Sequence, residues 1–118
     1  MKRHILFLFA MVILSYSCSS INAQKGIPQC IQDKITELKK QPLANPPISV
    51  YQYHYNDKLV YYISAPCCDR YTTLYDESCT VICRPSGGIT GKGDGKCSDF
   101  FEKRTDKKLL WKDTRKSE

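Results

Sequence analysis

Apolar residues recur at three- and four-residue steps near the start of the chain, which is the spacing of one face of an α-helix. If residues 28–40 are helical, this face carries Ile27, Ile31, Ile35 and Leu38. Pro28 suits the first helical turn, where its missing N–H is not needed. Three prolines between residues 41 and 47 stop the helix and lead the chain out extended. The pattern predicts one amphipathic helix over residues 28–40.

Segments rich in tyrosine and β-branched residues follow, at residues 48–55 and 58–64. They predict two strands, joined by a two-residue hairpin turn at Asn56-Asp57. A second hairpin is predicted from residues 71–75 and 80–84, which are joined by an acidic turn.

Side chains alternate along a strand, so the first strand has two different faces. One face carries Tyr51, Tyr53 and Tyr55, and the other carries Val50, Gln52 and His54. We expect the tyrosine rings to cover the helix, because tyrosine is common in strands and buries well. The alternative is a tyrosine platform that binds a sugar or a peptide.

The end of the chain predicts two short elements. Ser98 can cap a helical turn over residues 99–102. The apolar patch at residues 109–111 predicts an edge strand. Together the elements predict an α+β fold, in which one N-terminal helix packs on a small antiparallel sheet of four or five strands, cross-linked by three disulfides.

The first residues have the layout of a secretory leader. A basic start precedes an apolar run over residues 5–14, which is too short to anchor the chain across a bilayer. One processing site lies after Ala23. The other lies before Cys18, because residues 14–18 resemble a relaxed lipoprotein box whose cysteine carries lipid. We expect a signal peptide or lipoprotein leader at residues 1–23, one disulfide-stapled domain at 24–113 and a disordered tail at 114–118.

Six cysteines remain after either processing event: Cys30, Cys67, Cys68, Cys79, Cys83 and Cys97. An even set in a short exported chain indicates three disulfides. Zinc is the rival explanation, but an adjacent pair and a C-x3-C spacing do not match known zinc ligand sets, so we expect no metal.

The spacing restricts how these cysteines pair. Cys79 and Cys83 lie about 13 Å apart in an extended strand, which is beyond the reach of a disulfide. Adjacent cysteines point to opposite sides of an extended chain, so we expect Cys67 and Cys68 to have separate partners, with Cys30 and Cys97 among them.

The net charge of +6 is concentrated at the C-terminal end. Residues 24–102 carry nine basic and nine acidic side chains, whereas residues 103–118 carry seven basic and three acidic ones. A basic segment on an exported protein can contact anionic lipid or polysaccharide. We expect no nucleic-acid partner.

Five of the six glycines fall between Cys83 and Cys97. A phosphate loop is excluded, because Ser86 stands where its first glycine is required and Gly93 stands where it needs serine or threonine. We favour a structural interpretation, in which glycines permit tight turns and the flanking cysteines hold the ends of the loop.

A ligand site in this loop is the alternative interpretation. Asp94 and Asp99, with Asp69 or Asp76, offer oxygen ligands for calcium, although the pattern is not an EF-hand. If the protein has a binding site, we expect it beside Asp94. The candidate ligand residues are Asp69, Lys92, Asp94 and Asp99.

The sequence lacks the residue combinations that common catalytic mechanisms require. A nucleophilic mechanism needs a free cysteine or an activated serine beside a base, and His54 is the one histidine after the leader. A dithiol oxidoreductase would need C-x-x-C, which is absent. An enzyme is therefore the less favoured class, and no cofactor is expected. Two carboxylates, or His54 and a carboxylate, converging in a pocket would favour an enzyme.

Several motifs together resemble a known family. They are Cys30, Pro66-Cys67-Cys68-Asp69, Leu74-Tyr75-Asp76, Ile82-Cys83, the glycine-rich run at 87–97, and Asp99-Phe100. The set is similar to a family of small exported or lipid-anchored bacterial proteins classed as a domain of unknown function, over nearly all of the mature chain. The resemblance implies an exported cysteine-stapled domain and carries over no activity.

The function predicted is a non-enzymatic exported or lipid-anchored binding or structural module of the cell envelope. Its partner would be an envelope protein or polysaccharide, with membrane contact only through lipid on Cys18. Lipidation would place it in the outer membrane or periplasm; without lipid it would be periplasmic or secreted. The alternative is a protease inhibitor with a disulfide-held loop, in which Arg84 is the specificity residue.

Overall fold

The computed structural model describes residues 26–117. The predicted leader, with Cys18 and both processing sites, lies outside these residues. Along the chain the elements are α1 (Gln29–Lys40), β1 (Ser49–Tyr55), β2 (Lys58–Ile63), β3 (Thr73–Tyr75), β4 (Val81–Cys83), α2 (Phe100–Lys103) and β5 (Thr105–Lys112).

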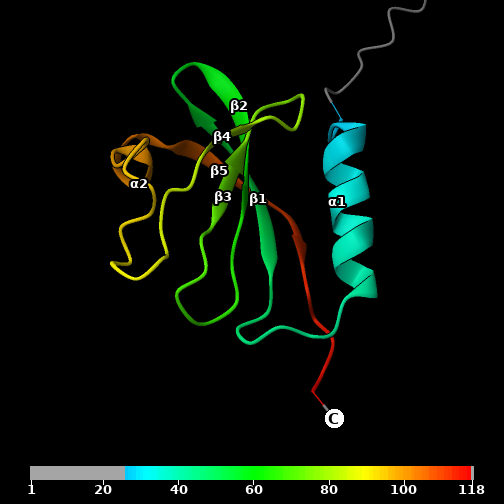
Figure 1. Ribbon diagram of the computed structural model, residues 1–118. Coiled ribbons are helices and arrows are strands. Elements are labelled where there is room, and N and C mark those ends of the chain that lie inside the picture. The colour runs from blue at the N-terminus through cyan, green and yellow to red at the C-terminus, as the bar shows by residue number, and fades with distance from the viewer. Residues whose placement is uncertain (1–25, 118) are drawn as a thin grey trace, which may run out of the picture.

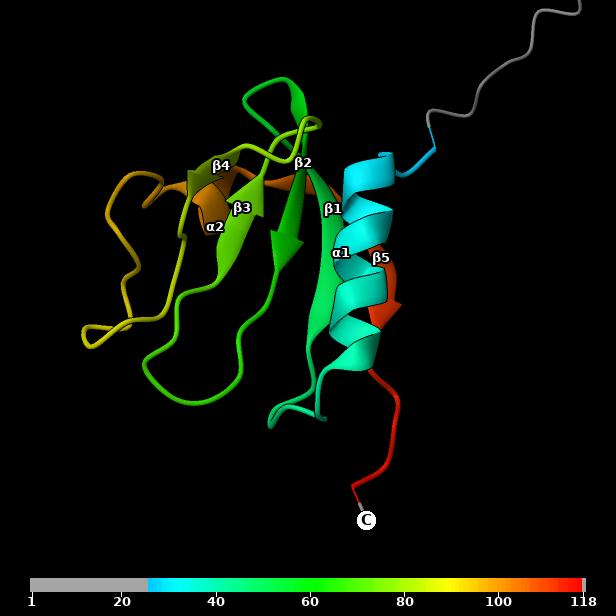
Figure 2. The ribbon, with the colours of Figure 1, turned by 45° about the vertical axis from the view of Figure 1, so that its right-hand side comes forward.

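All five strands form one antiparallel sheet in the order β4-β3-β2-β1-β5. Helices α1 and α2 lie on opposite sides of it (Figures 1 and 2). The predicted α+β class, the helix and both hairpins are confirmed. The last strand is longer than the patch at 109–111 predicted, because it pairs with most of β1.

The β1–β2 hairpin turns where the sequence predicts. Asn56 and Asp57 have φ values of 50° and 60°, the left-handed conformation that a two-residue hairpin turn requires at both positions. Tyr55 pairs with Lys58, so the ladder continues to the turn.

The side of the sheet that faces α1 is built from aliphatic and aromatic residues. Ile31 and Ile35 of the helix are buried against Val50 of β1 and Tyr61 of β2. Leu110 and Trp111 extend this cluster from β5. Burial of each such aliphatic side chain stabilises the fold by roughly 1.5–3 kcal/mol.

The tyrosines of β1 face the other way, which corrects the expectation that they cover α1. Tyr53 and Tyr55 are buried in a second cluster with Phe100 of α2. The Phe100 ring lies edge-on to both tyrosines, with centroids 5.5 and 5.3 Å away. Helix α1 occupies the Val50 face, so the alternation of β1 sends the tyrosines to the opposite face, where α2 covers them.

Two of the disulfides join distant elements. Cys30–Cys79 ties α1 to the turn between β3 and β4, and Cys83–Cys97 ties β4 to the segment before α2. The second bond holds the ends of the glycine loop, as predicted. Cys79 and Cys83 are not bonded to each other, which is also confirmed.

The third disulfide joins neighbours, Cys67 and Cys68, and corrects the prediction that each has a separate distant partner. The two expected partners are already used, because Cys30 bonds Cys79 and Cys97 bonds Cys83. Each of those bonds has a Cα–Cα distance of 6.1 Å, which is ordinary for a disulfide.

Removing either long-range disulfide should destabilise the domain, by an amount that grows with the logarithm of the number of residues in the closed segment. The bonded cysteines are 49 residues apart in Cys30–Cys79 and 14 apart in Cys83–Cys97. Loop-closure entropy predicts a loss of about 4 kcal/mol for Cys30→Ala/Cys79→Ala and about 3 kcal/mol for Cys83→Ala/Cys97→Ala. Urea denaturation measures both, and a larger loss for the shorter loop would contradict this explanation.

Candidate functional site

Hydrogen bonds between Asp94 and the backbone hold the glycine loop, residues 84–97, in its conformation. The Asp94 carboxylate accepts hydrogen bonds from the backbone N–H groups of Arg84 and Lys96, at 3.1 and 3.0 Å. The Asp94 N–H in turn donates to the Arg84 carbonyl at 2.9 Å. These contacts use Asp94 to hold the loop together.

Two glycines of this loop lie where no side chain fits. A Cβ on Gly87 would stand 2.0 Å from the Arg70 carbonyl oxygen, and one on Gly93 would stand 2.0 Å from that of Arg84. Both have positive φ. The glycines thus permit close backbone contacts, in agreement with the structural interpretation of the loop.

The other candidate ligand residues are spread out. Asp69 and Lys92 are exposed on loops, while Asp99 stands at the start of α2. Asp99 accepts a short hydrogen bond from the Tyr55 hydroxyl and pairs with Lys103 at 3.1 Å. Among residues 26–117, no three histidine, cysteine or acidic side chains form a metal-binding group. The candidate carboxylates of the calcium alternative are therefore not gathered into one side-chain cluster in this region.

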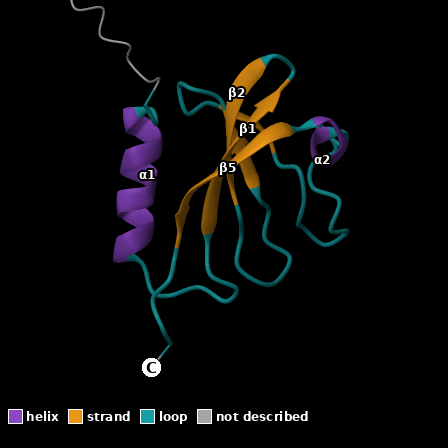
Figure 3. Cartoon of the chain, turned by 180° about the vertical axis from the view of Figure 1, so that it is seen from behind, coloured by secondary structure: helices purple, strands orange, loops and turns teal. Residues whose placement is uncertain are grey.

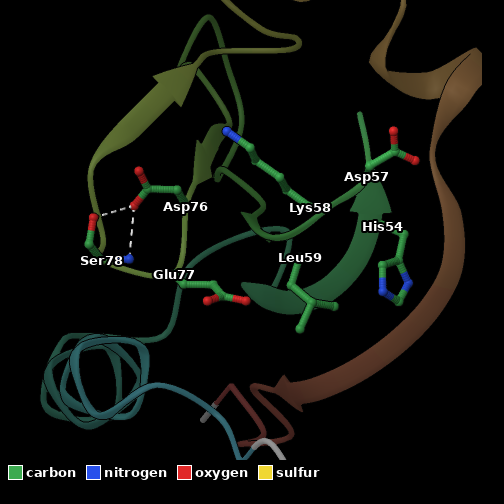
Figure 4. A pocket seen from close by; sticks show the side chains of 7 residues that line it. All are labelled: His54, Asp57, Lys58, Leu59, Asp76, Glu77 and Ser78. Atoms are coloured by element: carbon green, nitrogen blue, oxygen red, sulfur yellow. Dashed lines mark hydrogen bonds between the residues drawn. The ribbon is translucent and has the colours of Figure 1, made fainter.

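An open hollow of about 690 Å³ lies between the β1–β2 hairpin and the turn after β3 (Figure 4). His54 and Asp76 lie on opposite sides of it. The Asp76 carboxylate accepts from the Ser78 hydroxyl and from two backbone N–H groups of its own turn. These hydrogen bonds hold the pKa of Asp76 below its ordinary value. Asp76 therefore stabilises the turn.

His54 does meet a carboxylate on its other side. Its Nδ1 lies 2.9 Å from Asp106 Oδ2, and both line a second open hollow of about 600 Å³. The two side chains are 48% and 72% exposed, so water screens their interaction. The neighbouring hydroxyl, that of Thr105, is directed to Asp106. The pair has the geometry of an oriented base but lacks an activated nucleophile and a closed pocket.

Arg84, the candidate specificity residue of the protease-inhibitor alternative, is exposed and contacts the neighbouring segments. Its guanidinium donates to Thr73 at 3.3 Å and lies over the Tyr71 ring. The next residue, Pro85, is buried, and the Arg84 backbone is bonded to Asp94.

A contiguous group of rings and cations lies on the sheet face opposite α1, and we call it the aromatic surface. It consists of Tyr51, Tyr62, Phe101, Arg104 and Lys107. Ring centroids are 6.4 Å apart between Tyr51 and Tyr62 and 6.1 Å apart between Tyr62 and Phe101. Phe101 is 41% exposed, and Tyr51 and Tyr62 are half-buried. Helix α2 covers only part of this face, so these rings form its open margin.

Both cations of the aromatic surface lie over rings. Lys107 Nζ is 4.7 Å from the Tyr51 centroid, and the Arg104 guanidinium is 4.7 Å from that of Phe101. Arg104 also donates to the Tyr53 hydroxyl at 3.1 Å. No carboxylate of the described residues forms an ion pair with either cation. Their positive charge is therefore not neutralised within this part of the chain.

A family model described as Domain of unknown function (DUF6970) matches residues 36–113, more than half of the chain. The chain belongs to this family. The match contains the whole sheet, α2 and five of the six disulfide cysteines. No curated protein and no solved structure matches the chain. The resemblance of the motifs to a domain of unknown function is thereby confirmed.

The helices of the described region are short. None of them has the length and apolar character needed to cross a membrane.

The contact between Tyr55 and Asp99 should make the stability of the domain depend on pH. Hydrogen bonds from Tyr55 and Lys103 hold the pKa of Asp99 below its ordinary value of 3.8. A carboxyl of this kind stabilises the fold above its unfolded pKa, and the contribution is lost as pH falls through the lower folded value.

Tyr55→Phe keeps the ring against Phe100 but removes the hydroxyl. It should lower the urea midpoint clearly at pH 7, and the difference from the unmodified protein should shrink as the pH falls through the lowered folded pKa of Asp99. A difference that stays constant across the acid range would show that the contact with ionised Asp99 does not stabilise the fold.

Proposed function

We propose that the protein is a non-enzymatic binding module of the cell envelope that binds an acidic polysaccharide through the aromatic surface. The observation that carries the proposal is the open row of Tyr51, Tyr62 and Phe101 with Arg104 and Lys107 over its rings. Of the three β1 tyrosines in the alternative interpretation of a binding platform, only Tyr51 belongs to this surface. Tyr53 and Tyr55 are core residues.

The rings suit a partner with apolar faces. Tyrosine offers a large rigid area and a hydroxyl, and tyrosine and arginine are enriched at the energetic centres of interfaces. A sugar ring presents an apolar face of C–H groups that can pack against the exposed parts of these rings, beside the two cations. Adjacent rings about 6 Å apart could contact successive parts of a polymer.

The charge favours a polyanion. Residues 100–112, which form α2 and β5, carry five basic and two acidic side chains. Cations near an interface steer an anionic partner and set its register. Leu109 is 52% exposed opposite Tyr51 across the strand pair and adds apolar area beside the rings.

The placement in the envelope rests on the secretory leader pattern and on the disulfides. Disulfides persist in oxidising compartments and are rare in the cytosol. Lipid on Cys18 would then hold the module at a membrane surface.

Loss of the aromatic surface should weaken binding to an acidic polysaccharide. Tyr51→Ala/Lys107→Ala removes one ring and its cation, and should reduce the affinity for alginate at least about tenfold, the equivalent of ~1.4 kcal/mol. Isothermal titration calorimetry measures this, with neutral dextran and polyglutamate as comparison polymers. Binding to alginate should also weaken with added salt.

The chain offers a matched control on the opposite face. Lys34 lies 4.4 Å from the Tyr75 centroid, a contact like that of Lys107 with Tyr51. Tyr75→Ala/Lys34→Ala should leave the affinity unchanged. Equal losses in both variants, or tighter binding to polyglutamate than to alginate, would contradict the proposal.

Membrane anchoring can be tested separately. If Cys18 is the lipid-bearing terminus, metabolic labelling with a fatty acid should mark the protein, and Cys18→Ala should abolish the label. Absence of label on the unmodified protein would instead favour cleavage after Ala23.

A further inference from the structure

The three disulfides differ in how far they are exposed. Cys83 and Cys97 are 1% and 4% exposed, and Cys30 and Cys79 are half-buried. Cys67 and Cys68 are both exposed, on the loop that joins β2 to β3. In Figure 3 this loop lies at the end of the sheet away from the β1–β2 turn. The Cys67–Cys68 bond is therefore the most accessible of the three to a reagent in solution.

The Cys67–Cys68 bond also has no evident part in holding the fold. A disulfide stabilises a protein chiefly by closing a loop in the unfolded chain, and bonded neighbours close no such loop. By linkage, a bond that stabilises the fold is harder to reduce by the same free energy. Cys30–Cys79 and Cys83–Cys97 have this protection, and Cys67–Cys68 does not.

The loop around the pair is held without the sulfur–sulfur bond. The Cys67 N–H donates to the Asn45 carbonyl at 2.8 Å, and the Thr72 N–H donates to the Ser86 carbonyl at 3.1 Å. Gly87 lies directly against the Arg70 carbonyl. Both ends of the loop therefore stay attached to neighbouring segments when the bond opens.

A cleft of about 230 Å³ lies beside the pair. Ala65 and Pro66 line it on one side of the cysteines, and Arg70 and Tyr71 line it on the other. Its further walls mix apolar residues of α1 and of the chain between α1 and β1 with the polar side chains of Gln41, Ser64 and Asp113. A molecule that carries a thiol thus finds both a reachable disulfide and an adjoining partly apolar surface.

We propose that Cys67–Cys68 is a site of reversible thiol–disulfide exchange with a dithiol reductant. A thiolate of the reductant attacks one sulfur, the Cys67–Cys68 bond breaks, and a mixed disulfide forms while the other cysteine leaves as a thiolate. The second thiolate of the reductant then displaces the first cysteine. Two electrons pass to the pair, which takes up two protons, and the reductant becomes a cyclic disulfide.

The pair can be followed in one peptide. Trypsin releases residues 59–70, which contain Cys67 and Cys68 and no other cysteine. The oxidised protein is equilibrated with mixtures of reduced and oxidised dithiothreitol and quenched with iodoacetamide. It is then digested, and mass spectrometry counts the labels on each peptide. This peptide should carry two labels at a reduced-to-oxidised ratio at least about tenfold below that needed for Cys30, Cys79, Cys83 or Cys97, because exposed disulfides have the more oxidising potentials.

Reversibility is part of the test. Return to oxidised dithiothreitol should restore the unlabelled peptide, still as a single peptide with an internal bond. Labelling of all six cysteines at one ratio would overturn the proposal. So would a non-reduced digest in which residues 59–70 are linked to another peptide.

Variants separate this site from the structural disulfides. Cys67→Ser/Cys68→Ser should shift the melting temperature by less than about 3 °C, whereas Cys83→Ala/Cys97→Ala should lower it by roughly 10 °C or more. A comparable loss in the serine variant would show that the adjacent pair stabilises the fold, against the proposal. The labelling experiment on the unmodified protein holds even if the alanine control does not fold.

Discussion

The structure depends on the alternation of side chains along β1, a strand that pairs with β2 and β5 and whose two faces are both covered. Val50 points to α1 and helps to bury Ile31, while Tyr53 and Tyr55 point to the other side and are buried under Phe100 of α2. A shift of one residue in the pairing of β1 would exchange these two sets. Each helix would then meet side chains of the wrong shape, which fixes the register of the sheet.

The two helices cover unequal areas of the sheet, and this difference creates the candidate site. Helix α1 has twelve residues and runs along one face, whereas α2 has four and covers only the area around Phe100. The rings that continue the second face beyond α2 remain partly open to solvent. Because β5 begins directly after α2 and borders β1, its lysine side chain at position 107 reaches this uncovered edge. A short helix therefore leaves aromatic and basic groups together at the surface.

Local patterns were sufficient to predict most elements but not their partners. The spacing of Ile31 and Ile35, the turn at Asn56-Asp57 and the alternation of β1 are properties of neighbouring residues, and the structure confirms them. Which face α1 would cover is a question of tertiary packing, and there the expectation for the tyrosines was wrong. The signal that could have shown it is the adjacent pair Phe100-Phe101, since a short aromatic helix needs an aromatic face to bury against.

The same distinction applies to the candidate residues. Asp94 and Asp99 looked like ligands because they are acidic and lie near glycines, yet each is bonded to its own backbone or side-chain neighbours. These contacts account for both carboxylates within the fold. The sequence places Arg104 and Lys107 in a basic segment that can contact anionic lipid or polysaccharide, but its charge does not distinguish them from the other basic residues there. Their importance comes from the rings beneath them, which the sheet assembles from β1, β2 and α2.

The six cysteines form two kinds of disulfide, two that join distant elements and one that joins neighbours. Cys30–Cys79 and Cys83–Cys97 attach α1 and the segment before α2 to the β3–β4 hairpin at one edge of the sheet, and such cross-links support a domain with a small core. Once these four are paired, Cys67 and Cys68 have no remaining partner in the described chain except each other. Their bond adds no connection between elements, so any benefit that it confers must come from its chemistry or from the local shape of its loop. A chain that needed only structural cross-links would be equally well served without the pair.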